Sequence, residues 1–163
     1  MEQLMASDKV PMTRTGKINL DNELKRLMQE ERPAVIKAIE FARSLGDLSE
    51  NADYEAAKER QAWCEARIAE IQGAIAGAEV IDPSTLGGNK VIFGAYVSLL
   101  DVETDVEVTY QIVGTLESDV KGGRISVLSP IARAMIGKVV GDAVEVKSPK
   151  GVKEYQITKI QFK

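Results

Sequence analysis

The sequence contains no histidine and only one cysteine, Cys64, among its 163 residues. The absence of histidine excludes imidazole acid–base catalysis and histidine metal sites. A single cysteine forms neither an intrachain disulfide nor a cysteine metal cluster. Cys64 lies within a helical pattern, where a thiol is more typical of a small buried residue than of a nucleophile. These absences remove histidine- and cysteine-based chemistry from consideration.

Long apolar runs are also absent. No stretch approaches the ~20 residues that span a bilayer, and residues 1–10 lack the apolar core of a signal peptide. The sequence therefore predicts a cytoplasmic protein with no membrane partner. The formal net charge of -4 is unlike the basic surplus of a free nucleic-acid binder, although local basic patches are compatible with it.

Two long helical patterns occupy the first half of the chain, at residues 17–45 and 54–80. Pro33 interrupts the first pattern and predicts a kink or a helix restart, because an interior proline removes a backbone hydrogen bond. The apolar stripes comprise Leu20, Leu24, Leu27, Met28, Val35, Ile36, Ile39, Ala42 and Leu45, then Ala57, Cys64, Ile68, Ile71 and Ile75. Joined by a short turn, the patterns predict an antiparallel α-helical coiled-coil hairpin with arms ~40–45 Å long.

The pattern changes from helical to alternating after a boundary rich in Pro, Ser and Gly at residues 82–89. Alternation predicts strands at 91–102, 107–114 and 125–128 and a final hairpin formed by 143–147 and 154–160. Residues 129–137 predict one short helix, with Ser129 as N-cap and Gly137 at its end. This second region is therefore a small, mostly antiparallel sheet domain with one helix.

The patterns together predict an α+β protein of two domains. The predicted parts are a flexible leader (1–12), a coiled-coil finger (13–81), a linker (82–89) and the sheet domain (90–163). A finger of this length is too long to lie on the small domain that follows it, so its reach requires a use.

Two acidic residues, Asp47 and Glu50, lie at the turn between the helical patterns, directly after Gly46. They admit two compatible interpretations. Asp47 reads as the N-cap of the second helix and Glu50 as its capping-box partner, and both carboxylates suit the positive end of a helix dipole. Alternatively, the turn carries them to a place where they help to hold a divalent cation such as Mg²⁺, which prefers oxygen ligands.

The chain resembles the Gre family of bacterial transcript cleavage factors, most closely its GreA members. The motifs that carry the resemblance are residues 46–54 (GDLSENADY), 56–58 (AAK), 91–95 (VIFGA), 126–133 (SVLSPIAR) and 136–138 (IGK). The likeness extends from about Pro11 to Phe162. One departure is Asp53, where the family usually carries Glu, and the charge is kept.

The resemblance implies a coiled-coil finger followed by an FKBP-like domain. It implies a factor that binds bacterial RNA polymerase, docks the second domain at the rim of the secondary channel and inserts the finger to the active centre. There, Asp47 and Glu50 are expected to help hold a Mg²⁺ ion shared with the polymerase, which cleaves the backtracked RNA near its 3′ end. Two carboxylates are too few for a stable site, so no tightly bound metal is expected in the free protein.

The resemblance also assigns roles to other residues. Arg43 and Lys58 flank the tip and are expected to contact the 3′ part of the extruded RNA through its phosphates; a solvated helix face explains them equally well. Tyr54 either stacks on a base or packs the tip. The expected polymerase-docking segment includes Ser129, Pro130, Ile131 and Arg133.

Three alternative functions deserve comparison with transcript cleavage. A passive regulator would bind the same channel without promoting cleavage, and the Asp47/Glu50 pair argues against it. A peptidyl-prolyl isomerase would need an aromatic pocket, whereas aromatic residues are only 5% of the chain. A plain coiled-coil adaptor would use the tip carboxylates only as caps.

Overall fold

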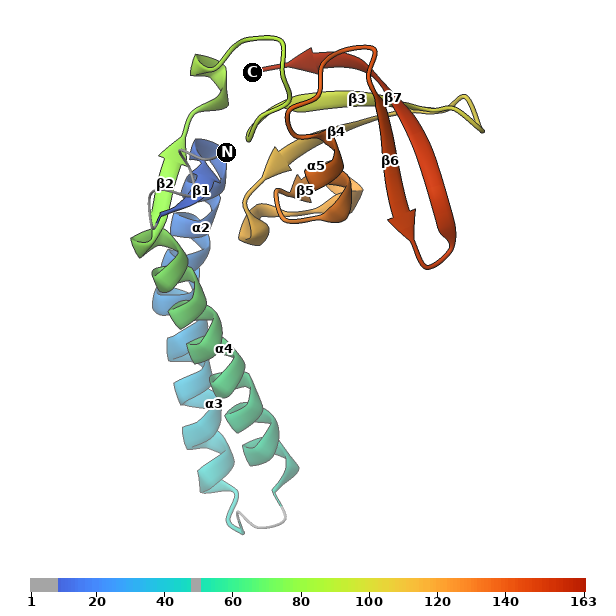
Figure 1. Cartoon of the computed structure of the whole chain (residues 1–163). Helices are drawn as coiled ribbons and strands as arrows, with labels where there is room; N and C mark the ends of the chain where they lie inside the picture. The colour runs from blue at the N-terminus through green and yellow to red at the C-terminus, as the bar shows by residue number, and fades with distance from the viewer. Residues whose placement is uncertain (1–8, 48–50) are drawn as a thin grey trace. The chain divides into compact units, whose positions relative to one another are not determined.

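The computed structural model describes residues 9–47 and 51–163 (Figure 1). The chain divides into two compact units, named here the hairpin unit (Ile18–Gly77) and the sheet unit (Met1–Lys17 with Ala78–Lys163). The hairpin unit is helical, and the sheet unit contains a five-stranded sheet and one short α-helix. The predicted class, a helical hairpin followed by a sheet domain with one short helix, is confirmed.

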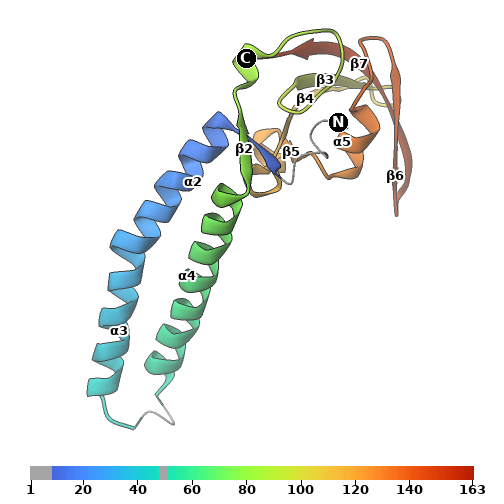
Figure 2. The ribbon, with the colours of Figure 1, turned by 60° about the vertical axis from the view of Figure 1, so that its left-hand side comes forward.

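Two antiparallel arms form the hairpin unit. The first arm consists of α2 (Arg14–Arg26), the π-helical segment η1 (Leu27–Glu31) and α3 (Arg32–Ser44). The second arm is α4 (Ala52–Ala76), which runs beside α3 (Figures 1 and 2).

The interruption predicted at Pro33 takes the form of the π-helical segment. Within η1, the Arg32 backbone N–H bonds to the carbonyl of Leu27, five residues earlier. Pro33 then stands in the first turn of α3, where its missing N–H does no harm. In a regular helix its ring would meet the carbonyl of Gln29, which lies inside the wider π turn. The predicted restart is therefore confirmed.

A single apolar seam holds the two arms together. Its buried members are Leu20, Leu27, Val35, Ile39, Ala42, Ala57, Cys64, Ile68 and Ile71. Burial raises the pKa of the Cys64 thiol, as expected for a seam residue. The wider apolar stripe predicted from the sequence was wrong at Met28, Ile36 and Leu45, which are 39–54% exposed. A two-helix contact buries only a narrow stripe, so side chains one position off the seam stay in solvent.

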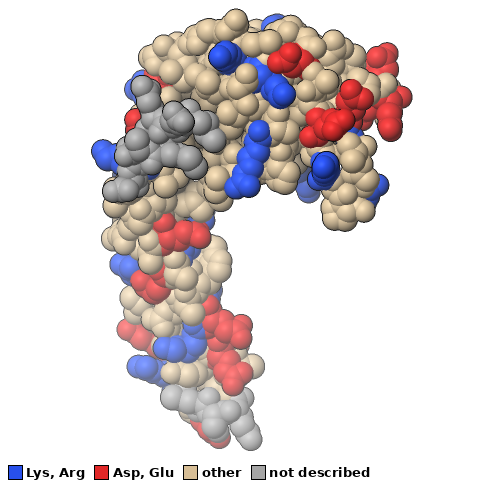
Figure 3. Space-filling model, in the orientation of Figure 1, with Lys and Arg blue, Asp and Glu red and all other residues tan. Residues whose placement is uncertain are grey.

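Arginine–glutamate pairs cross the hairpin on both sides of the seam. Arg67 donates two hydrogen bonds to Glu23, at 2.8 and 2.9 Å, and Arg32 donates two of 2.8 Å to Glu65. Arg60 also bonds to Glu31 at 2.8 Å. The Arg67 hydrogen bond lowers the pKa of Glu23. Acidic and basic side chains accordingly alternate along the hairpin surface shown in Figure 3.

The hairpin begins and ends at a small parallel sheet of the sheet unit. Strand β1 (Val10–Thr13) pairs with β2 (Ala78–Ile81). The prediction of a flexible leader over 1–12 was therefore wrong for Val10–Met12, and residues 1–8 lie outside the described ranges. The prediction of helix up to residue 80 was also wrong, because α4 ends at Ala76, with Gly77 as C-cap, before the strand.

The five-stranded sheet has the order β5-β4-β3-β7-β6. Its strands are β3 (Tyr96–Asp101), β4 (Glu107–Val113), β5 (Arg124–Ser126), β6 (Ala143–Ser148) and β7 (Gly151–Gln161). All neighbours are antiparallel except β4 and β5, which are parallel. The prediction of a mostly antiparallel sheet is thus confirmed, with β4 and β5 as its one parallel pair. Residues 91–95, predicted as strand, instead form a largely buried approach to β3.

Helix α5 (Pro130–Met135) supplies Ala132 and Met135 to the core of the sheet unit. The remaining buried members of this core are Val91, Phe93, Ala95, Val97, Leu99, Ile112, Ile125, Val144 and Ile157. None of the helices in ranges 9–47 and 51–163 has the length and apolar content needed to cross a bilayer.

The Arg67–Glu23 pair predicts how acid acts on the hairpin. The lowered pKa of Glu23 stabilises the folded state at neutral pH, and this contribution is lost as the pH falls below the ordinary value of 4.5. Arg67→Met should therefore lower the free energy of unfolding by about 1 kcal/mol at pH 7 and by less near pH ~3. Urea unfolding followed by far-UV circular dichroism measures both values.

Lys25→Met is the matched control, because Lys25 is an exposed cation of the same arm. Equal losses from Arg67→Met at both pH values would contradict the charged contribution and leave only side-chain packing.

Candidate functional site

The first arm of the hairpin ends in a regular helix stop. Leu45 is the C-cap of α3; its N–H bonds to the Ala42 carbonyl at 3.2 Å, and the Gly46 N–H bonds to the Arg43 carbonyl at 3.3 Å. Gly46 follows with φ of 105°, a left-handed conformation that suits glycine because it has no Cβ. The prediction that Gly46 ends the helix is confirmed. Asp47, the next residue, is exposed.

The second arm begins at Ala52, with Asn51 as its N-cap. The Asn51 side-chain oxygen accepts the Tyr54 N–H at 3.1 Å. Its amide nitrogen donates to the carbonyl of Ala42 at 2.6 Å. One side chain therefore caps α4 and bonds to the last turn of α3, so that Asn51 closes the turn.

The prediction of Asp47 as the N-cap of α4 was therefore wrong, because that position is taken by Asn51, four residues further along the chain. Glu50 lies outside the described residues. Sequence reasoning missed Asn51, although asparagine is as good an N-cap as aspartate. Asn51 also reaches Ala42 across the turn, a contact that favours it as the cap.

Metal binding by the tip stays a prediction. Within ranges 9–47 and 51–163, no three Cys, Asp or Glu side chains gather closely enough to hold a metal ion. That search does not include Glu50. Asp47 and Glu50 have the right chemistry for Mg²⁺, whose usual protein ligands are one or two carboxylates.

Tyr54 is half-buried and packs against the seam residues Val35, Ile39 and Ala57. Packing thus accounts for part of its side chain. Its stacking on a base stays a prediction.

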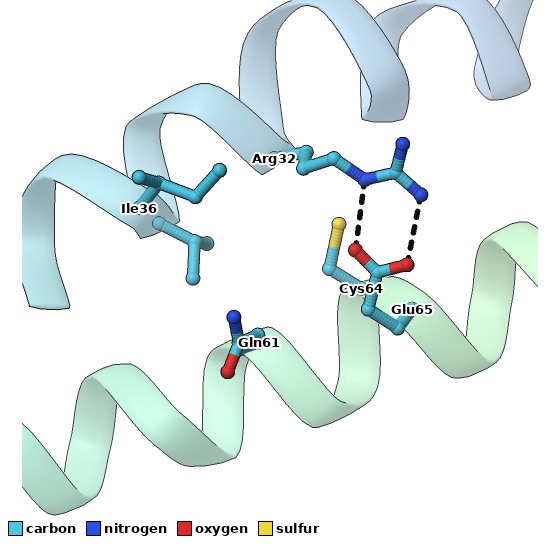
Figure 4. A pocket seen from close by; sticks show the side chains of 6 residues that line it. Arg32, Ile36, Gln61, Cys64 and Glu65 are labelled. Carbon is cyan, nitrogen blue, oxygen red and sulfur yellow. Dashed lines mark hydrogen bonds and ion pairs between the residues drawn. The ribbon is translucent and has the colours of Figure 1, made fainter.

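The helical register places Arg43 and Lys58 on one flank of the hairpin. Arg32 and Ile36 on α3 face Gln61 and Glu65 on α4 across a shallow hollow (Figure 4). Arg43 follows Ile36 by seven residues, which is two helical turns along the same face. Lys58 precedes Gln61 by three residues and donates to it at 3.0 Å.

We name the face that carries Arg43 and Lys58 the basic flank. Both side chains are exposed and lie between the hollow and the tip. An RNA strand passing along this flank would meet two cations before it reached Asp47, so the arrangement fits phosphate contact.

The segment predicted to dock on a partner lies at the start of α5. The Ser129 hydroxyl caps the helix by accepting the Ala132 N–H at 3.3 Å, and it donates to the Ser126 carbonyl at 2.7 Å. Ile131 packs against the sheet core. Ser129 and Ile131 thus have structural roles, whereas Pro130 and Arg133 are exposed. These two are the members of the segment best placed to meet a partner.

Comparison with known proteins covers almost the whole chain. A family described as "Transcription elongation factor, N-terminal" matches residues 10–80. A second, "Transcription elongation factor, GreA/GreB, C-term", matches residues 86–162.

Several curated relatives match this chain over almost their whole length. A transcription elongation factor GreA of Phenylobacterium zucineum is 63% identical over 95% of this chain and 99% of its own length. One of Caulobacter vibrioides is 61% identical over the same shares. The solved structure of GreA factor homolog 1 (Gfh1) of Thermus thermophilus is 29% identical, with a TM-score of 0.40, and covers 94% of this chain and 99% of that one.

The double role of Asn51 predicts a graded loss of stability. Asn51→Ala removes both hydrogen bonds and should lower the free energy of unfolding by about 1–2 kcal/mol. Asn51→Asp keeps the acceptor for Tyr54 and loses only the donor to Ala42, so it should lose less. Urea unfolding compares the variants, and an Asn51→Ala protein as stable as the parent would contradict the assigned cap.

Proposed function

Because the chain belongs to the GreA/GreB family of transcription elongation factors, we propose that it binds RNA polymerase and stimulates cleavage of backtracked nascent RNA. The protein is a transcription elongation factor of the GreA type and not an enzyme. The polymerase active centre breaks the phosphodiester bond, and this factor supplies groups that the centre lacks.

The observation that carries this proposal is the division of roles at the tip. Asn51, and not Asp47, is the N-cap of α4, and Asn51 also bonds to α3. Asp47 is exposed in the turn between α3 and α4, and this turn lies at the end of the hairpin opposite the points where the chain enters and leaves it. A partner that receives the tip can therefore reach an acidic side chain there.

The shape of the hairpin supports delivery of that group into a channel. Helix α4 has 25 residues, which gives it a length of ~37 Å. The hairpin is only two helices wide. Its apolar seam and the ion pairs that cross it hold the two arms together. We propose that the polymerase secondary channel receives this finger, while exposed residues such as Pro130 and Arg133 contribute to docking outside it.

At the active centre, Asp47 and Glu50 would add carboxylate oxygens as ligands of a Mg²⁺ ion of the polymerase. Such an ion would stabilise the attacking and leaving oxygens of phosphoryl transfer. The two carboxylates are acceptors, so they also orient a water by accepting its hydrogen bonds. The released product is a short 3′ fragment, and the remaining transcript regains a 3′ end in the active centre.

The basic flank fits the RNA that this reaction requires. A backtracked transcript extrudes a single strand, whose phosphates attract Arg and Lys. Arg43 and Lys58 are the two exposed cations on that flank nearest the tip, and we propose that they steady the strand. Tyr54, half-buried beside them, contributes at most the exposed part of its ring to stacking on a base.

Removing the tip charges without changing side-chain size separates the effect of charge from that of fold. The double variant Asp47→Asn, Glu50→Gln keeps the size of both side chains and leaves Asn51 in place. It should fold and bind polymerase as the parent does, but lose about 100-fold in the rate of transcript cleavage. The assay is 3′ shortening of labelled RNA in a backtracked complex.

Glu55→Gln is the matched control, since Glu55 is an exposed acid in the first turn of α4. It removes a charge near the tip without touching the two carboxylates and should cleave like the parent. Near-parental cleavage by the double variant would reject the mechanism. A parent protein that binds the complex without any cleavage would identify a passive channel-binding regulator.

The role of the basic flank is tested by removing its two cations. Arg43→Ala with Lys58→Ala should weaken action on backtracked complexes, because two phosphate contacts are lost. The slope of log affinity against log salt should become shallower by about 0.7 for each lost contact with a single strand. Cleavage titrations at several salt concentrations measure this slope.

The control is Lys25→Ala with Lys37→Ala, which removes two exposed cations of the first arm. If this control and the flank variant change the slope equally, the cations act only through overall charge, and the assigned contact is wrong.

A further inference from the structure

A buried carboxylate, Glu117, joins two distant parts of the sheet unit. Its side chain is only 5% exposed, and it lies just after β4, at the end of a short 3-10 turn (Thr115–Glu117). One carboxylate oxygen accepts two backbone N–H groups, from Gly114 at 2.8 Å and from Thr13 at 3.0 Å. The other oxygen accepts the Thr13 hydroxyl. Thr13 is 104 residues away in sequence.

Thr13 has a second role, at the start of α2. Its hydroxyl oxygen accepts the Gly16 N–H at 3.0 Å, the geometry of an N-cap. Thr13 is also the last residue of β1 and is only 3% exposed. Glu117 therefore holds the residue at which strand β1 ends and the first helix of the finger begins. The negative charge also lies near the positive end of the α2 dipole.

Gly16 leaves the space that this contact needs. A Cβ atom at Gly16 would lie 1.9 Å from Glu117 Oε1 and 2.1 Å from Glu117 Cδ, distances that no side chain tolerates. Glycine here is not required for a left-handed conformation, because Gly16 is not among the glycines with positive φ. It is required because a carboxylate occupies the adjacent volume.

Capping the short turn explains only part of this arrangement. The bond from the Gly114 N–H serves the turn itself, and an ordinary capping box would need no more. The other two bonds are donated by Thr13. Because Gly16 has no Cβ, the carboxylate can approach the start of α2. These features show a contact built toward the first turn of α2.

We propose that Glu117 is a positioning residue for transcript cleavage, acting through Thr13 on the first turn of α2. This inference rests on the proposed function, in which the sheet unit docks and the finger tip acts. The Glu117 contact fixes the first turn of α2 within the docked unit, and the arm that leads along the chain to Asp47 starts from this turn. Loosening it should impair the catalytic step more than binding.

The test uses the full-length protein and two variants that attack the contact from opposite sides. Thr13→Val removes the hydroxyl, with its bonds to Glu117 and Gly16, and keeps the side-chain shape. Gly16→Ala displaces the carboxylate, although alanine is by itself the better helix former. Thr13→Ser keeps the hydroxyl and should therefore behave like the parent. Thr109→Val is the control, because it removes the hydroxyl contact to Ser98 elsewhere in the same unit.

Three quantities are measured for each variant: the Kd for RNA polymerase, the cleavage rate at saturating factor, and amide hydrogen exchange at Thr13, Gly16 and Gly114. Thr13→Val and Gly16→Ala should exchange faster at these amides and keep the Kd within about 2-fold. Their saturated cleavage rate should fall by about 10-fold or more, since small misplacements of reacting groups are costly. Thr109→Val should leave the saturated rate unchanged.

Faster exchange with a parental saturated rate would show a purely structural contact and overturn the inference. The inference would also be overturned if a variant cleaved more slowly at low concentration but at the parental rate when saturating. The contact would then serve binding alone. If the parent protein itself failed to stimulate cleavage, the proposed function would fall first, and this result is distinct from either of the other two.

Discussion

A two-helix hairpin has one seam in which to bury apolar side chains, and the rest of this structure depends on that constraint. The seam is narrow, so Val35 and Cys64 are buried while Ile36, one residue away, is 45% exposed. Arginine–glutamate pairs on both sides of the seam, such as Arg32–Glu65 and Arg67–Glu23, add contacts where no further core exists. The result is an extended element that carries its turn far from the points where it begins and ends.

The turn between the arms carries an exposed acidic residue, Asp47, and is closed by another residue. Asn51 caps the first turn of α4 and bonds to Ala42 on α3. On the basic flank, Arg43 and Lys58 offer cations to a polyanion that approaches the same tip. An exposed carboxylate and two exposed cations thus lie near the same tip, which is the combination that the proposed assistance to RNA cleavage requires.

Local signals in the sequence predicted most elements, including the restart at Pro33, the stop at Gly46 and the capped helix at Ser129. The misses are non-local. Intrinsic preference could not identify the cap of α4, because aspartate and asparagine are similarly good N-caps, and the Asn51 bond to Ala42 joins residues on two different helices. The parallel pairing of β1 with β2 and the Glu117–Thr13 contact join residues far apart in sequence, which no local pattern reveals. The candidate site was predicted from a motif, and the sequence did not show which residue closes its turn.

The central claim is that the tip adds ligands to a metal ion that the polymerase alone holds weakly. The most direct test is the rate of transcript cleavage in a backtracked complex as a function of Mg²⁺ concentration, with and without saturating factor. Added ligands should lower the Mg²⁺ concentration that gives half-maximal cleavage, because the ion is bound more tightly. A higher maximal rate with an unchanged Mg²⁺ midpoint would contradict the claim.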